Sequence, residues 1–122
     1  MIKKFDENPS NASRAVQIWQ ILISKAYNRQ IMTYEDLADL LHYGGAGVFD
    51  QKLGHIMYFC SQNKLPPLTI LVVNKITGKP GTGFVSQSDL NADRELVFKY
   101  PWYGIYPPSE KDFEDAWRKG KI

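Results

Sequence analysis

The sequence predicts a mostly helical α+β fold, in which a three-helix core carries a small β wing and is followed by C-terminal helices. Two observations predict it: apolar residues recur at helical spacing in three successive segments and again near the end, and one short apolar run in the middle is bracketed by prolines and glycines. At 122 residues, 43% hydrophobic and 23% charged, the chain has the composition of one core-forming unit. We therefore expect a single domain, residues 1–122.

The first helix is predicted over residues 12–28. Its apolar residues recur at steps of three and four, which places them on one helical face: Ala15, Val16, Trp19, Leu22, Ile23 and Ala26. The turn-forming residues before it offer three alternative N-caps: Ser10, Asn11 and Ser13.

A second helix is predicted within the stretch IMTYEDLADLL, residues 31–41. Thr33 stands three residues before Asp36, so the two can form a capping box at the start of the helix. The negative charges of Glu35 and Asp36 also oppose the positive end of the helix dipole. Tyr34 falls on the apolar face of this helix.

The third helix and the wing follow a glycine-rich break. Asp50 is the expected cap of a helix over QKLGHIMYFCSQN, residues 51–63. Pro66-Pro67 then prevents further helix, and the apolar run LTILVV, residues 68–73, is expected to form a buried strand. Glycines and a proline in residues 77–83 predict a tight turn or wing.

The C-terminal part is predicted to contain two further helices. One covers much of residues 86–100, and a short one begins at Ser109, which stands three residues before Asp112 in a second capping-box pattern. Between them lies the aromatic segment PWYGIYPP, residues 101–108. Its rings could wrap back onto the first helix, dock a protein partner or stack on exposed bases.

The order of helix, short turn, helix, helix, strand and glycine-rich turn is that of a winged helix. Residues from about 15 to 84 also resemble the DNA-binding domain of the alkylguanine-DNA alkyltransferases and of the alkyltransferase-like proteins. Four sequence segments are similar to motifs of that family and follow one another in the same order: TYEDLA (33–38), QKLG (51–54), NKLPP (63–67) and LVVNKITGKPGTGF (71–84). We accordingly divide the chain into an alkyltransferase-like winged-helix core, residues 12–84, and a helical and aromatic extension, residues 85–122.

The chain departs from this family where the family's chemistry lies. The resemblance implies a methyl-accepting cysteine, with a histidine beside it, at the entrance to the strand, yet only Leu68, Thr69 and Ile70 stand there. A threonine hydroxyl does not replace a thiolate at neutral pH. The single cysteine, Cys60, falls on the apolar side of the third helix, where an inert packing thiol is expected. We therefore expect no catalytic residue, no enzyme activity and no cofactor.

Two further family residues are replaced. The tryptophan that the alkyltransferase-like proteins carry at the acceptor position is missing, and Gln51 stands near the position of the arginine that fills the vacated base stack. What the resemblance still implies is a DNA-binding scaffold, with the tyrosine of the second-helix motif close to a phosphate. Tyr34 could play this part, or could simply pack in the core.

The middle of the chain is its basic part, because residues 44–84 hold four lysines and one acid, Asp50. Each lysine alone could equally be a solvated surface charge. Together with the motif residues they form the predicted DNA-binding set: Thr33, Tyr34, Gln51, Lys52, Asn63, Lys64, Lys75 and Lys79.

Composition excludes several other classes. The longest apolar run is too short to cross a bilayer and no signal peptide is visible, so we expect a cytoplasmic protein without a membrane partner. One cysteine allows no internal disulfide, and His42 and His55 lack the neighbours of a metal site. The sequence thus predicts a non-enzymatic DNA-binding protein that recognises altered or distorted DNA. The alternative is a protein-interaction adaptor on the same scaffold, docking through the C-terminal aromatic segment without binding nucleic acid.

Overall fold

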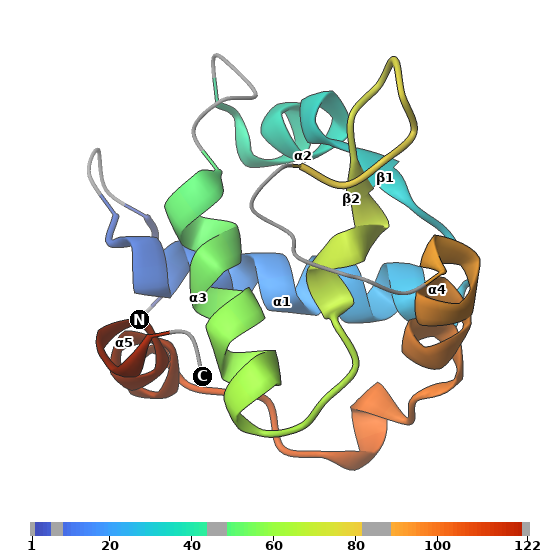
Figure 1. Cartoon of the computed structure of the whole chain (residues 1–122). Helices are drawn as coiled ribbons and strands as arrows, with labels where there is room; N and C mark the ends of the chain where they lie inside the picture. The colour runs from blue at the N-terminus through green and yellow to red at the C-terminus, as the bar shows by residue number, and fades with distance from the viewer. Residues whose placement is uncertain (1, 6–8, 44–48, 82–88, 121–122) are drawn as a thin grey trace.

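The computed structural model describes residues 2–5, 9–43, 49–81 and 89–120, and these form a mostly helical α+β fold (Figure 1). The elements in chain order are α1 (Asn11–Tyr27), β1 (Met32–Thr33), α2 (Tyr34–Leu41), α3 (Asp50–Gln62), a 3₁₀ helix (Leu68–Leu71), β2 (Val72–Val73), α4 (Leu90–Lys99), a second 3₁₀ helix (Trp102–Gly104) and α5 (Glu110–Lys119). The prediction of a mostly helical α+β protein is confirmed.

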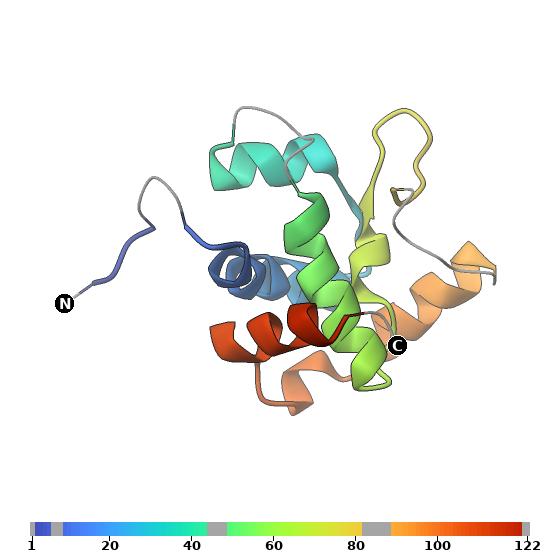
Figure 2. The ribbon, with the colours of Figure 1, turned by 60° about the vertical axis from the view of Figure 1, so that its left-hand side comes forward.

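Helix α1 is the central element, and α3 and α5 both pack against it and against each other. Five of the six residues predicted for its apolar face are buried: Ala15, Trp19, Leu22, Ile23 and Ala26. Val16 is only partly buried, and Ala12 and Ile18, which were not predicted, are buried as well. Among the three alternative caps, Ser10 is the N-cap, because its hydroxyl accepts a hydrogen bond from the Ser13 N–H at 3.0 Å. Figure 2 shows α2 and the turn after β2 at one end of the molecule and α5 towards the other.

A short parallel pairing joins the two halves of the core. Met32 pairs with Val72 and Thr33 with Val73, so the start of α2 is tied to the end of the first 3₁₀ helix. The predicted capping box of α2 is confirmed: the Thr33 hydroxyl accepts from the Asp36 N–H at 3.0 Å, and the Asp36 carboxylate accepts from the Thr33 N–H at 3.1 Å.

The predicted strand over residues 68–73 is wrong in its first four residues. Leu68–Leu71 is a 3₁₀ helix and only Val72–Val73 is a strand, although all six residues are buried. An apolar run shows that a segment is buried but not whether it is extended. Extension needs a partner, and β1 offers only two residues for pairing.

The predicted cap of α3 is also wrong. Phe49 is the N-cap, no side chain caps this helix, and Asp50 is its first residue. Phe49 is 1% exposed and packs edge-on against Tyr43, with ring centroids 5.3 Å apart. Burial of an aromatic ring therefore sets the start of α3, and the Asp50 carboxylate is left free of a capping role.

The C-terminal extension completes the core. The α5 capping box is confirmed, since Ser109 and Asp112 exchange hydrogen bonds of 2.8 and 3.1 Å. In the aromatic segment, Trp102 is buried against Trp19 with ring centroids 5.5 Å apart, whereas Tyr103 and Tyr106 are exposed. The segment thus wraps back onto α1 through one ring and presents others to solvent. None of the helices in the described ranges is long and apolar enough to span a membrane.

Candidate functional site

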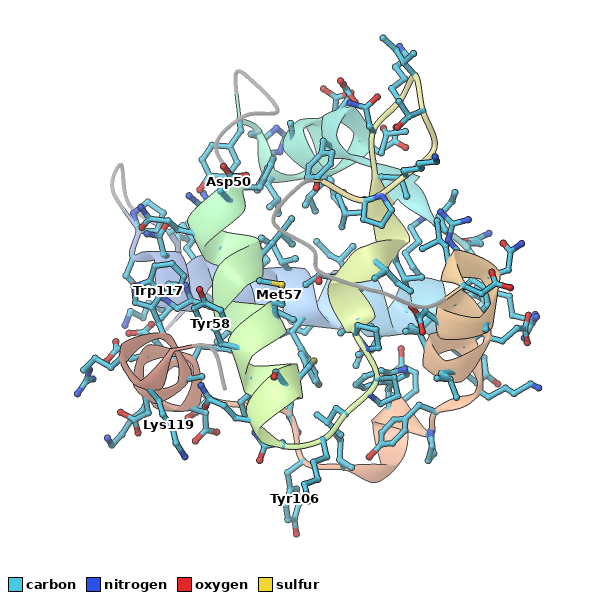
Figure 3. The ribbon with its side chains drawn as sticks, viewed as in Figure 1. Asp50, Met57, Tyr58, Tyr106, Trp117 and Lys119 are labelled. Carbon is cyan, nitrogen blue, oxygen red and sulfur yellow. The ribbon has the colours of Figure 1, made fainter. Side chains whose placement is uncertain are left out.

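A groove of about 310 Å³ runs along α3, and we call it the α3 groove. Asp50, Leu53, Gly54, Met57 and Tyr58 line it from α3 itself. Trp117 of α5 lines it on one side, and on the other lie Tyr34, Thr69 and the Pro80-Gly81 end of the turn after β2. Figure 3 shows Asp50 at the N-terminal end of α3, with Tyr58 and Trp117 on the same side of the helix.

Tyr34 connects α2 to the turn after β2. Its hydroxyl oxygen accepts a hydrogen bond from the Gly81 N–H at 3.1 Å. A Cβ on Gly81 would lie 2.5 Å from that oxygen, so the close approach requires glycine. Burial raises the pKa of Tyr34, and the nearby negative charge of Asp50 raises it further, while the Gly81 hydrogen bond acts in the opposite sense. Tyr34 is half-buried: it packs on the core and also presents its hydroxyl to the groove.

The turn after β2, residues 74–81, is held in place by several hydrogen bonds. The Asn74 side-chain oxygen accepts from the N–H groups of Ile76 and Thr77, at 2.8 and 3.2 Å. Arg94 of α4 donates to the Gly78 carbonyl at 2.8 Å. The side chains of the predicted DNA-binding residues Lys75 and Lys79 project from this turn and are exposed.

Trp117 forms the opposite edge of the groove, and sequence analysis did not identify it. Its ring stacks on His55 at 4.6 Å between centroids with an interplanar angle of 3°, and on Tyr58 at 5.4 Å and 28°. A Cβ on Gly54 would lie 2.7 Å from the indole, so this glycine lets α5 approach α3 closely. The glycine inside a helical pattern was the one sequence feature that indicated such an approach.

Thr69 lies at the α3 groove, whereas Cys60 lies in the core. Thr69, one of the three residues at the entrance to the predicted strand, is 8% exposed and lines the α3 groove together with Tyr34. Cys60 is buried in the core, and burial raises the pKa of its thiol to about 12. At neutral pH the thiol is therefore protonated and unreactive.

Gln51 and Lys52 face α1, not the groove. The Asn11 side chain donates to Gln51 Oε1 at 2.8 Å and accepts from Lys52 Nζ at 3.0 Å. Lys52 also lies 5.2 Å from the centroid of the Tyr43 ring. Burial, and to a smaller extent the charge of Arg14, lowers the pKa of Lys52.

Asn63 and Lys64 lie at the other end of α3. The Asn63 side chain donates to the Phe59 carbonyl at 2.8 Å, and Lys64 has a φ of 56°. A helix of 13 residues is about 18 Å long, so these two residues are well separated from Asp50. The structure thus gathers Thr33, Tyr34, Lys75 and Lys79 around one end of the molecule, and places Gln51 with Lys52, and Asn63 with Lys64, elsewhere.

Within the described ranges, no three histidine, cysteine, aspartate or glutamate side chains are grouped so that they could hold a metal ion. Compared with known proteins, the chain matches no family, no curated protein and no solved structure.

Proposed function

We propose that this chain is a non-enzymatic cytoplasmic DNA-binding protein of the alkyltransferase-like type, with a winged-helix core, and that it recognises altered or distorted DNA at the α3 groove. One observation carries the proposal. Three separate segments that resemble the alkyltransferases line the same groove: residues 33–38 through Tyr34, residues 51–54 through Leu53 and Gly54, and residues 71–84 through Pro80 and Gly81.

The groove also has suitable surfaces for nucleic acid. Its volume of about 310 Å³ is in the range of small-molecule sites, and the rings of Tyr34, Tyr58 and Trp117 are of the kind that stack on bases displaced from a duplex. Lys75 and Lys79, on the adjacent turn, can neutralise backbone phosphates. The order of the elements and the pairing of β1 with the strand before the turn support a winged-helix arrangement.

The chemistry of the groove favours binding without reaction. Thr69 brings only a hydroxyl to the groove, and the thiol of Cys60 lies in the core. Alkyl transfer therefore forms no part of the proposed function.

The salt dependence of duplex binding tests this proposal. Replacing both Lys75 and Lys79 by alanine should weaken binding to all DNA sequences alike and lower the slope of log affinity against log salt by about 1 to 2. A charge-matched control, Lys99→Ala with Lys111→Ala on α4 and α5, should leave the slope unchanged. A wild-type protein without salt-dependent DNA affinity would contradict the proposal.

A second surface favours the alternative function, protein docking. Tyr27 and Tyr103 are 74% and 63% exposed, their ring centroids lie 5.9 Å apart, and they border a pocket of about 230 Å³ between α1 and the second 3₁₀ helix. Tyr106, 96% exposed, projects from the molecule in Figure 3. Exposed aromatic rings are enriched at protein interfaces, so an adaptor role becomes the better proposal if DNA binding fails its test.

A further inference from the structure

We infer that the α3 groove selects a planar base carrying an exocyclic amino group, and that Asp50 makes this selection. The inference rests on the proposed function, because it names the class of base that the DNA-binding groove accepts. It follows from the Asp50 carboxylate, which forms no ion pair with the residues that the structure describes, from the hydroxyl of Tyr34 and from the flat aromatic edge formed by Tyr58 and Trp117.

Asp50 brings a hydrogen-bond acceptor to the groove. Its side chain makes no capping hydrogen bond, and it forms no ion pair with any residue that the structure describes. An ionised carboxylate can only accept hydrogen bonds, so it pairs with an amino group and not with a carbonyl oxygen.

Tyr34 brings a hydrogen-bond donor to the same groove. Because its oxygen already accepts from the Gly81 N–H at 3.1 Å, its own O–H proton remains available for a ligand. Asp50 and Tyr34 both line the α3 groove, so a ligand in the groove can meet both groups. One acceptor and one donor in the same groove suit a base that has both an amino group and a ring nitrogen, as adenine and cytosine do.

The aromatic edge restricts the ligand to a flat shape. Trp117 is held by stacking on His55 and Tyr58 and is 37% exposed at the groove. The charge of Asp50 also repels phosphate, which orients the base towards Asp50 and the backbone towards Lys75 and Lys79 on the neighbouring turn.

The experiment compares duplexes of one sequence that differ only in a single unpaired nucleotide. The unpaired base is adenine, purine, which lacks only the amino group, or thymine, and affinity is measured by fluorescence anisotropy at fixed salt. We expect adenine to be bound about 10-fold more tightly than purine or thymine, as for one hydrogen bond to a charged acceptor. Equal affinity for adenine and purine would overturn the inference.

The variant Asp50→Ala, which removes the acceptor, should reduce the adenine-to-purine ratio to near 1, and Asp50→Asn, which keeps a neutral acceptor oxygen, should reduce it less. Affinity for a fully paired duplex should stay the same or rise in both, because a negative charge is removed. The matched control Asp39→Asn, on the exposed side of α2, should keep the wild-type ratio. Asp50→Glu, which retains the carboxylate, should keep part of the preference, and circular dichroism checks the fold of each variant. A full preference that persists in folded Asp50→Ala would overturn the inference.

The same measurements separate this inference from the proposed function. Salt-dependent binding of paired duplex with no base preference contradicts only the role of Asp50. An absence of all duplex binding contradicts both proposals. Tighter binding of a lysine-rich peptide than of any duplex would also overturn both, because aromatic rings with a carboxylate suit an organic cation as well.

Discussion

Two tryptophans of the C-terminal extension occupy opposite environments. Trp102 is 3% exposed, packs edge-on against Trp19 and donates its indole N–H to the Val97 carbonyl at 2.7 Å. Trp117 is 37% exposed and stacks on side chains of a single helix, α3. The comparison shows that aromatic residues from one stretch of chain can serve either the core or a groove, depending on how many sides of the ring are covered.

The core tryptophans are covered from several elements. Trp19 lies at the centre, with Phe59 of α3, Trp102 and Phe113 of α5 at centroid distances of 5.7, 5.5 and 6.0 Å. These rings pack directly against Trp19, as expected in a closely packed interior. Trp117 has no such enclosure, so its ring remains available to a ligand.

The largest effect is expected when the core ring is removed. Trp102→Ala should lower the free energy of unfolding by about 3–5 kcal/mol, because it leaves a cavity beside Trp19 and an unpaired Val97 carbonyl. Chemical denaturation measures this loss. The control Tyr103→Ala, in the same 3₁₀ helix but 63% exposed, should cost less than about 1 kcal/mol. Equal costs for the two variants would break the distinction between core and surface rings in this segment.

Removal of the Trp117 ring from the α3 groove should lower the free energy of unfolding less, and should weaken the binding of an unpaired base. Trp117→Ala should cost about 1–2 kcal/mol, since it removes two stacking contacts from a partly exposed ring. The same variant should lose most of the preference for an unpaired adenine, as measured by anisotropy, while Trp117→Phe keeps part of it. A cost as large as that of Trp102→Ala would assign Trp117 to the core instead.

The smallest effect concerns His55, on which Trp117 stacks. Burial has the largest effect on the pKa of His55 and lowers it. The hydrogen bond to the Gln51 carbonyl and the charge of Glu114 raise the pKa by less than burial lowers it, and the charge of Lys52 lowers it slightly further. Since the folded state holds this proton more weakly than the unfolded state, the free energy of unfolding should fall as pH drops below about 6.5.

Urea denaturation at pH 7 and pH 5 tests this dependence. His55→Gln should flatten it by no more than about 1–2 kcal/mol over this range. His42→Asn, at the exposed C-cap of α2 with a φ of 61°, should leave it unchanged, since asparagine tolerates that conformation. A pH dependence that survives in His55→Gln would show that other groups carry it.

Several parts of the fold could be predicted because they depend on residues three or four positions apart. The capping boxes at Thr33 and Ser109 were correct, since the residues that donate and accept lie within one helical turn. The predicted cap at Asp50 failed because a buried aromatic ring, Phe49, determines where α3 starts. Four residues of the predicted site lie near one another: Thr33, Tyr34, Lys75 and Lys79. Gln51 and Lys52 do not join them, because both side chains hydrogen-bond to Asn11, which is 40 residues from Gln51 in the sequence.

By itself the sequence determined the helices, the capping boxes of α2 and α5, the burial of residues 68–73 and the core position of Cys60, because periodic apolar spacing and local hydrogen bonds act over a few residues. Only the tertiary structure decided the groove. The Tyr34 hydroxyl meets the Gly81 N–H across 47 positions of sequence, and Trp117 reaches α3 only because Gly54 has no side chain to exclude it. Such contacts depend on the packing of whole helices, so no local pattern along the chain specifies them.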